Sequence, residues 1–351
     1  MAMTTRKTSS EPSAPPPDGK DTFYFQWHFI ERCNLCCAHC YQHSYDTREL
    51  AEEKLLEIAH ILERTLQKWQ LQGRVSLTGG EPFLRPDLLL RLLHFFEHSD
   101  SFYWTGILTN GTLVTEDIGA QMGDFKKLKE IQVSIDGASA DCHDRIRGRG
   151  SFAKAVEALK LLKQRGLTVS IMFTLHRQNR QEVIPLIDWA DKMGVDYLTV
   201  ERMVPTDEAD IDRFYLKPLE LKEVYENIYQ KKREVEKNSS LKIRVSRPLW
   251  GLIDSKMGGF CPAGFSSLAI LHDGTVLPCR RLEIPLGNIL REGLFKIWYT
   301  SDVLWRLRNK GLLAPKCRDC QWRSQCGGCR AVAYNVHGDF MAEDPQCWKE
   351  A

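Results

Sequence analysis

Hydrophobic and polar positions follow two rhythms along the chain from about residue 23 onwards. Short runs rich in Val, Ile, Phe and Tyr end in Gly, Asn or polar residues, which is typical of β-strands. Longer stretches with apolar residues at helical spacing lie between them. The predicted strands are Phe23–Glu31, Arg74–Thr78, Phe102–Leu108, Ile131–Ile135, Leu167–Leu175 and Tyr197–Arg202.

The helical stretches alternate with these strands. Glu49–Trp69 and Phe152–Gln164 carry amphipathic patterns, and Gly166 provides a stop signal after the second. Six β-α pairs predict an α/β fold with a parallel sheet and right-handed crossovers, either open or rolled into a partial barrel. In such sheets the chemistry gathers at the carboxyl ends of the strands.

The flanking segments differ in composition from this region. Residues 1–20 are polar and rich in Ser, Pro and Lys, which predicts a disordered tail. Residues 217–237 are highly charged and predict a solvated bridging helix. Residues 268–277 carry a hairpin signal at Asp273-Gly274. We therefore divide the chain into a tail (1–20), an α/β domain (21–216), a linker (217–250) and a C-terminal cysteine-rich domain (251–351).

Composition and charge exclude several classes of protein. A chain of 351 residues that is 43% hydrophobic and 27% charged can bury a core, and it is not a miniprotein, a coiled coil or a fully disordered chain. The net charge of +2 provides no strong field for nucleic acid or an acidic membrane. Because we find no secretory signal and no apolar run of membrane length, we expect a cytoplasmic protein without nucleic-acid or membrane partners.

The 12 cysteines are clustered. Four lie between Cys33 and Cys40, seven lie between Cys261 and Cys347, and Cys142 stands alone as a free thiol. A cytosolic chain keeps its thiols reduced, so clustered cysteines indicate metal ligands rather than disulfides. The first group is also too crowded for comfortable disulfide geometry.

The first group follows the first predicted strand and offers three thiolates to a metal. The available sets are Cys33/Cys37/Cys40 and Cys33/Cys36/Cys40. Three thiolates leave one iron of a [4Fe–4S] cluster open to an external ligand. A zinc site completed by His39 or His43 is the alternative.

The spacing Cys33-x3-Cys37-x2-Cys40 resembles the signature of the radical S-adenosylmethionine (SAM) enzymes. The resemblance implies a partial (β/α)6 TIM-like barrel. It also implies that Cys33, Cys37 and Cys40 hold a [4Fe–4S] cluster that binds SAM, with Cys36 as a spare thiol.

Further segments resemble the SAM-binding motifs of that family and close successive strands. They are Thr78–Pro82, Leu108–Gly111, Ser134–Gly137 and His143–Phe152. Glu81 can shape its turn or bind the SAM ammonium group. Arg147 is either a bidentate partner for the SAM carboxylate or a member of a surface ion pair. We expect His39 to pack on the adenine. The residues that the resemblance assigns to SAM are His39, Gly79, Gly80, Glu81, Thr109, Asn110, Ser134, Asp136 and Arg147.

The seven C-terminal cysteines resemble the SPASM extension of many radical SAM enzymes. The resemblance implies one auxiliary [4Fe–4S] cluster held by Cys317, Cys320, Cys326 and Cys347, and a second cluster held by Cys261, Cys279 and Cys329. Two features depart from the family pattern: only Gly327-Gly328 separates the fifth and sixth cysteines, and Pro285 stands where some members have an eighth. The second auxiliary cluster therefore has an open or non-cysteine position. Two structural zinc sites are the alternative.

The implied chemistry is reductive cleavage of SAM to a 5′-deoxyadenosyl radical, which removes hydrogen from a substrate. The auxiliary clusters would accept an electron or bind the substrate, and a flavodoxin or ferredoxin would donate electrons. Long hydrophobic strands that close a barrel would shield such a radical from solvent. The leading hypothesis is a maturase of ribosomally made peptides or protein side chains. Because only 32 residues precede Cys33, we expect recognition of a leader peptide to need a separate binding protein or another surface of this one.

Two other functions stay open. The segment from Cys326 to Cys347 resembles that of the radical SAM oxidases and decarboxylases of alternative haem pathways. Four arginines could bind the propionates of such a substrate, or could simply be solvated at the surface: Arg202, Arg244, Arg280 and Arg281. A non-enzymatic metal scaffold is the third possibility, against which the SAM motifs argue. Asp273 and Glu201 are the candidates for acid–base chemistry.

Overall fold

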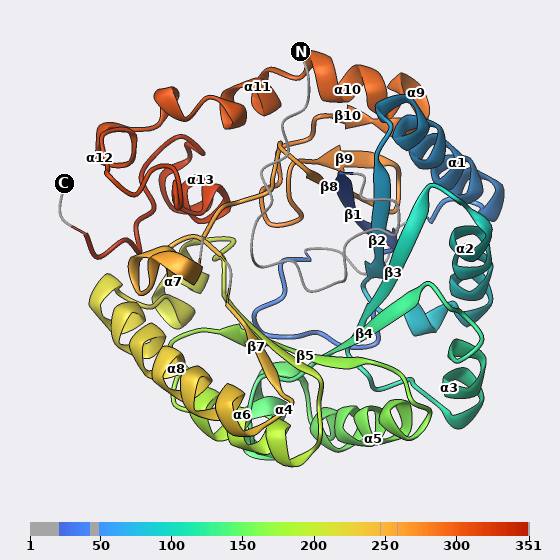
Figure 1. The fold of residues 1–351 in the computed structure, drawn as a ribbon, viewed down its shortest axis with the longest axis horizontal. Coiled ribbons are helices and arrows are strands. Elements are labelled where there is room, and N and C mark those ends of the chain that lie inside the picture. Colours follow the sequence, from blue (N-terminus) through green and yellow to red (C-terminus); the bar gives the residue numbers. More distant parts are fainter. Residues whose placement is uncertain (1–20, 43–48, 246, 258, 350–351) are drawn as a thin grey trace.

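The computed structural model of the protein describes residues 21–42, 49–245, 247–257 and 259–349. The predicted tail (1–20) and His43 lie outside the described residues. Ten strands form one curved sheet in the order β10-β9-β8-β1-β2-β3-β4-β5-β6-β7. The strands line the inside of a ring of helices (Figure 1), as expected for a partial TIM-like barrel.

The sheet is parallel from β8 to β7, and β9 and β10 are antiparallel additions. The six predicted strands are present with small shifts in their ends. The strands are β1 (Thr22–Ile30), β2 (Gln72–Gly79), β3 (Phe102–Thr109), β4 (Leu128–Ser134), β5 (Val169–Leu175), β6 (Tyr197–Arg202), β7 (Lys242–Arg244), β8 (Ser267–Ile270), β9 (Thr275–Leu277) and β10 (Gly287–Asn288).

The helices of the barrel lie outside the strands (Figure 1). They are α1 (Glu52–Trp69), α2 (Pro86–His98), α3 (Glu116–Met122), α4 (Ala140–Arg147), α5 (Ser151–Gln164), α6 (Val183–Lys192), α7 (Glu208–Phe214) and α8 (Pro218–Asn238). The C-terminal helices are α9 (Ile289–Glu292), α10 (Leu294–Thr300), α11 (Asp302–Arg308), α12 (Pro315–Arg318) and α13 (Arg330–His337). None of the described helices combines the length and apolar content needed to cross a membrane.

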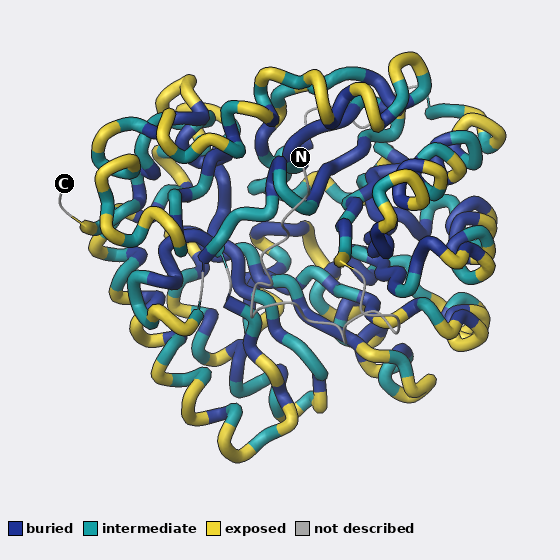
Figure 2. The backbone as a smooth tube through the Cα atoms, turned by 45° about the horizontal axis from the view of Figure 1, so that its top comes forward, coloured by how far each residue is buried: buried dark blue, intermediate teal, exposed yellow. Residues whose placement is uncertain are grey.

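The two faces of the barrel strands differ in chemistry. In β1, Phe23, Phe25 and Trp27 are at most 1% exposed, whereas Tyr24 and Gln26 between them line an interior cavity. The same alternation runs through β2, β4 and β5, because side chains on a strand point to opposite faces. Figure 2 shows the buried strands inside a more exposed rim. The apolar side chains thus pack under the helices, and the face that encloses the cavity is largely polar.

The predicted linker is part of the barrel rather than a solvated bridge. One face of α8 is buried through Leu221, Val224 and Ile228, against α6 among other elements. The short strand β7 then pairs with β6 and extends the sheet. The prediction of a fully solvated helix is wrong because the apolar residues of this segment recur at helical spacing among its many charges.

The cysteine-rich domain continues the sheet. The predicted hairpin is present as β8 and β9, joined through Asp273-Gly274, and β8 pairs with β1. Helices α9 to α13 close the part of the ring that the barrel leaves open (Figure 1). The cysteine-rich domain therefore encloses part of the same interior as the barrel strands.

Candidate active site

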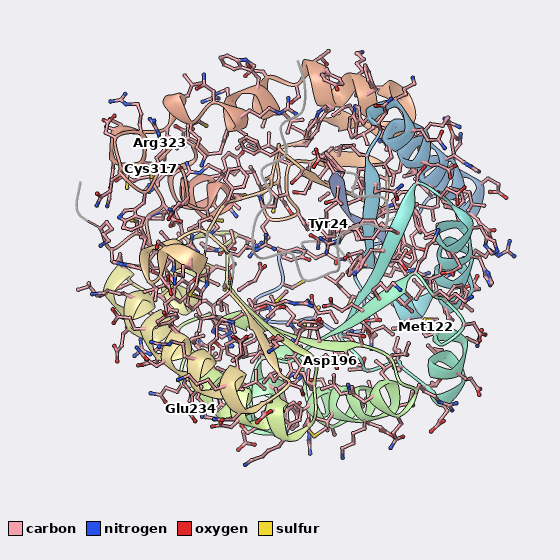
Figure 3. The ribbon with its side chains drawn as sticks, in the orientation of Figure 1. Tyr24, Met122, Asp196, Glu234, Cys317 and Arg323 are labelled. Atoms are coloured by element: carbon pink, nitrogen blue, oxygen red, sulfur yellow. The ribbon has the colours of Figure 1, made fainter. Side chains whose placement is uncertain are left out.

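A cavity of about 1450 Å³ occupies the inside of the barrel. Its lining includes Thr78 and Thr109 at the carboxyl ends of β2 and β3, and Thr22 and Arg74 near the opposite ends of β1 and β2. Tyr24, also in the lining, lies near the centre of the ring in Figure 3. A large molecule can therefore reach from the carboxyl ends of the strands deep into the barrel.

The loop after β1 separates its four cysteines. Cys33, Cys37 and Cys40 line the cavity, whereas Cys36 is exposed and is not part of the lining. Of the two three-thiolate sets that the spacing leaves open, this placement favours Cys33/Cys37/Cys40.

Each of these three sulfurs has an N–H group directed at it. The amide nitrogen of Asn110 lies 3.9 Å from the Cys33 sulfur, and an Arg147 nitrogen lies 3.9 Å from that of Cys37. The backbone N–H of Gln42 donates to the Cys40 sulfur at 3.4 Å. Such donors tune the reduction potentials of iron–sulfur clusters. Burial raises the pKa of Cys33 to about 11, so a metal cation is needed to hold it as a thiolate at neutral pH.

Gly79 and Gly80 allow the end of β2 to approach the loop after β1. A Cβ atom on Gly80 would lie 2.1 Å from the backbone oxygen of Arg32. Glu81 follows, fully buried, and its carboxylate accepts hydrogen bonds from the Phe83 and Asn110 backbones and from the Thr109 hydroxyl. Burial raises the pKa of Glu81 to about 7. Of the two roles expected for Glu81, the geometry supports shaping the turn.

A buried ion pair fixes Arg147 beside the cysteine loop. Asp136 is fully buried, and one of its oxygens lies 2.5 Å from Arg147 Nε and 2.7 Å from His39 Nε2. Its other oxygen accepts from the Thr174 backbone at 2.9 Å. Burial alone would raise the pKa of Asp136, but Arg147 and then His39 hold it well below its usual range. Arg147 is thus a positioned cation inside the site, not a surface ion pair.

The His143–Phe152 motif supports that arrangement from behind. His143 Nδ1 accepts from the Asp136 backbone at 3.2 Å. Asp144 accepts from the backbones of Gly150 and Phe152 at 2.6 and 2.8 Å, which caps the start of α5. Because Arg147 ends α4, between these two anchors, its backbone is held at both sides.

Seven of the nine residues expected at SAM line the cavity, and two lie behind it. Those in the lining are His39, Gly79, Gly80, Thr109, Asn110, Ser134 and Arg147. Glu81 and Asp136 are fully buried instead and contact other lining residues. The ring nitrogen of His39 is engaged with Asp136, so only the rest of its ring is available for a ligand.

The C-terminal cysteines form two groups. Four of them line a second cavity of about 30 Å³: Cys317, Cys320, Cys326 and Cys347. Figure 3 shows Cys317 at the periphery of the molecule. The other three, Cys261, Cys279 and Cys329, line the large cavity. This division is the one that the resemblance implies, and Pro285 lines neither cavity.

Each group contains a thiol whose burial is sufficient to require a metal for its ionisation. Burial raises the pKa of Cys261 and of Cys326 to about 11, and the Gly328 N–H donates to the Cys326 sulfur at 3.3 Å. Within the described residues, no three His, Cys, Asp or Glu side chains meet closely enough to hold one metal ion. Cys142 is buried away from these groups, and its sulfur contacts the Asp136 carbonyl at 3.6 Å.

The large cavity is strongly basic. The cations in its lining are Arg74, Arg147, Arg202, Arg244, Arg247, Arg280, Arg281, Arg308, Lys310, Arg323 and Arg330, against the acids Glu130 and Glu201. Sequence reasoning missed Arg74 and Arg247. The polar positions that alternate with Val75 and Leu77 in β2 could have identified Arg74 as facing inward.

The two acid–base candidates have structural partners. Glu201 accepts from Arg247 and Arg281 at 2.5 Å each. Burial would raise its pKa, but these arginines lower it to about 2. Asp273 is exposed and accepts from the backbone and hydroxyl of Thr275 in the hairpin turn. Both carboxylates are thus engaged by other groups of the protein.

The arginines suggested for propionates are also engaged. Arg202 forms a buried ion pair with Asp344, and Arg244 bonds Glu130 at 2.8 and 2.9 Å. The partner of Arg280 is Glu283, and that of Arg281 is Glu201. Their side chains shape the cavity wall, and each would reach a ligand only with its remaining N–H groups.

Comparison with protein families agrees with this geometry. Residues 27–190 match the radical SAM superfamily, and residues 261–321 match the SPASM iron–sulfur cluster-binding domain. The chain is therefore a radical SAM enzyme with a C-terminal SPASM domain. That class binds SAM at a [4Fe–4S] cluster and carries auxiliary iron–sulfur clusters. Cys326, Cys329 and Cys347 lie beyond the matched part of the SPASM domain.

Relatives of different function share this architecture. The chain is 28% identical over 341 residues to the AdoMet-dependent heme synthase of Methanosarcina barkeri, covering 92% of this chain and 95% of that one. It is 29% identical to mycofactocin maturase MftC of Mycolicibacterium smegmatis, covering 92% and 81%. Streptococcus suis SuiB bound to S-adenosylmethionine has the same fold with a TM-score of 0.74, 17% identity, and coverage of 95% and 77%.

Proposed function

We propose that the protein oxidises an acidic small molecule of the tetrapyrrole type, by radical SAM chemistry, inside the basic cavity. The observation that carries this proposal is the lining of the cavity: ten arginines and one lysine against two glutamates among the described residues, in a chain whose net charge is only +2. A concentration of one charge in a cleft of low dielectric attracts substrates of the opposite charge.

The cysteine loop fits the SAM-binding cluster of the class. Cys33, Cys37 and Cys40 would hold it and leave one iron for SAM. When bound, the cluster supplies the electron that cleaves SAM and so generates the hydrogen-abstracting radical. Arg147, held by Asp136, would orient the SAM carboxylate, while Gly79, Gly80, Thr109, Asn110 and Ser134 would form the rest of its cradle.

The C-terminal domain fits two auxiliary clusters with different tasks. Cys317, Cys320, Cys326 and Cys347 would ligate one cluster fully, away from the large cavity. Cys261, Cys279 and Cys329 would hold the other where it faces the substrate. After hydrogen transfer from a substrate C–H bond to the 5′ carbon, the substrate radical must lose one electron, which a cluster held at this second site would accept.

Maturation of a peptide, the leading hypothesis from sequence, is the second candidate. The 29% identity to MftC favours it, and the same fold binds the precursor peptide SuiA in SuiB, at a TM-score of 0.73. An acidic peptide would satisfy the same cavity charge. A peptide substrate would require a leader-binding partner. Either substrate would require an electron donor such as flavodoxin or ferredoxin.

Anaerobic reconstitution tests the proposal. Dithionite-reduced protein with SAM should release 5′-deoxyadenosine, and a tetracarboxylate porphyrin such as iron coproporphyrin III should accelerate the release and be recovered in oxidised form. An acidic peptide that accelerates the release while the porphyrin does not would replace the first candidate with the second. Protein that contains zinc and cleaves no SAM would overturn both.

A further inference from the structure

Of the cations that line the cavity from the described barrel strands, Arg74 alone has no carboxylate partner, since Arg202 pairs with Asp344 and Arg244 with Glu130. It is 8% exposed, its Nε is buried without a hydrogen-bond partner, and it lines the cavity. The two acids in the lining are already engaged: Arg244 and Ser170 bind Glu130, and Glu201 has its two arginines. A buried unpaired charge is costly to the folded protein.

Aromatic side chains hold the guanidinium in place. Arg74 pairs in register with Tyr24 on β1 and with Trp104 on β3. Its guanidinium carbon lies 5.7 Å from the Tyr24 ring centre and 4.9 Å from that of Trp104. Stacking on ring faces fixes the plane of a guanidinium but occupies none of its N–H groups.

Gly106 keeps the Trp104 ring in that position. A Cβ atom on Gly106 would lie 2.3 Å from an indole carbon, so the ring lies along β3 where any other residue would displace it. Gly106 itself lines the cavity. Because Gly106 has no side chain, the Trp104 ring can pack along β3 and the cavity beside it stays open.

We propose that Arg74 is a carboxylate-binding subsite for the far end of the substrate, opposite the SAM-binding loop. Its two terminal nitrogens, Nη1 and Nη2, form an end-on fork that matches two carboxylate oxygens. Arg74 precedes Thr78 by four residues on β2, which corresponds to about 13 Å along a strand. A substrate anchored here must therefore span at least that distance to reach the carboxyl ends of the strands, where SAM would bind.

This inference rests on the proposed function, and binding measurements test the two separately. The probes are coproporphyrin III, a tetracarboxylate, and its neutral tetramethyl ester, each titrated into cluster-loaded protein and followed by the Soret absorbance. Arg74→Gln should weaken acid binding by about 10- to 100-fold, and Arg74→Lys should weaken it less. The ester should bind weakly to all variants. Arg64→Gln, an exposed cation of α1 outside the cavity lining, should change the affinity by about twofold or less.

A second readout distinguishes ligand binding from a structural role. If Arg74 serves a ligand, its replacement removes an unpaired buried charge, so the melting midpoint of Arg74→Gln should be unchanged or higher. A lowered midpoint with unchanged porphyrin affinity would overturn the subsite. So would equal binding of acid and ester, or no binding of the acid by the wild type. SAM cleavage by the wild type in any of these cases would leave the proposed radical chemistry standing.

Discussion

Two cysteine sites in this molecule differ in what surrounds them. Cys33, Cys37 and Cys40 line a cavity of about 1450 Å³, whereas Cys317, Cys320, Cys326 and Cys347 line one of about 30 Å³. Three thiolates beside open space suit a cluster that must bind an exchangeable ligand. Four thiolates around a small space suit a cluster closed to ligands, which can only transfer electrons or stabilise the fold. Ligand number and cavity size thus indicate the same division of roles.

The largest effect should come from removing one thiolate of the open site. We expect Cys37→Ala to abolish 5′-deoxyadenosine formation, because its sulfur faces the cavity beside Arg147. Cys36→Ala is the matched control: this neighbouring thiol is exposed and outside the lining, so its variant should keep wild-type activity. Product is measured by chromatography after reduction with dithionite. Loss of activity in Cys36→Ala with retention in Cys37→Ala would reverse the assignment of the ligands.

Removal of a thiolate from the closed site should have a different signature. Cys326→Ala should lower the iron content by about four atoms and lower the melting midpoint, yet retain SAM cleavage in the absence of substrate. Cys142→Ala, also buried but in the lining of neither cavity, should leave the iron content unchanged. Iron and sulfide assays on the reconstituted variants check this. SAM cleavage lost together with the iron would show that the two sites are not separable.

Much of the fold and of the two cysteine sites could be predicted from the sequence, and part could not. The strands, the hairpin and the clustering of the cysteines follow from local patterns, whereas the barrel and the division of the cysteines into ligand sets are implied by the family resemblance. The spacing alone could not choose between Cys36 and Cys37, because that choice depends on which sulfur the folded loop turns inward.

Long-range pairing was the harder part to predict. Asp136 resembles a ligand contact in sequence, but the fold buries it between Arg147 and His39. Arg74 belongs to no sequence motif, because its role depends on contacts with Tyr24 and Trp104 from neighbouring strands. Such contacts join residues that are distant in the chain, and no local pattern records them.

A buried ion pair connects the barrel to the closed site and should have an intermediate effect. Arg202 at the end of β6 bonds Asp344, which lines the small cavity of the closed site and also accepts from the Cys329 backbone at 2.7 Å. Asp344→Asn leaves Arg202 without its counterion, at a cost of about 3–5 kcal/mol. The melting midpoint should fall by roughly 5–10 °C. Asp339→Asn, which loses only an exposed partner of Arg306 at 3.9 Å, should change it little. Equal midpoints in the two variants would contradict the proposed link.

The smallest predicted effect concerns Glu81, which shapes the turn beside the open site and has no counterpart at the closed one. Burial raises its pKa from 4.5 to about 7, so the folded state retains a proton that the unfolded chain loses above about pH 4.5. The contribution of Glu81 to the free energy of unfolding is therefore greatest below about pH 4.5. It falls as the pH rises to about 7, by roughly 3 kcal/mol in total.

Glu81→Gln removes the titrating group and should flatten the dependence of the melting midpoint on pH over that interval, measured at constant ionic strength. The amide keeps one oxygen acceptor for the backbone N–H groups of Phe83 and Asn110 and, like the protonated acid, carries no charge. Glu53→Gln on the exposed surface of α1 is the control and should keep the wild-type slope. An undiminished slope in Glu81→Gln would mean that the pH dependence of the turn comes from another group.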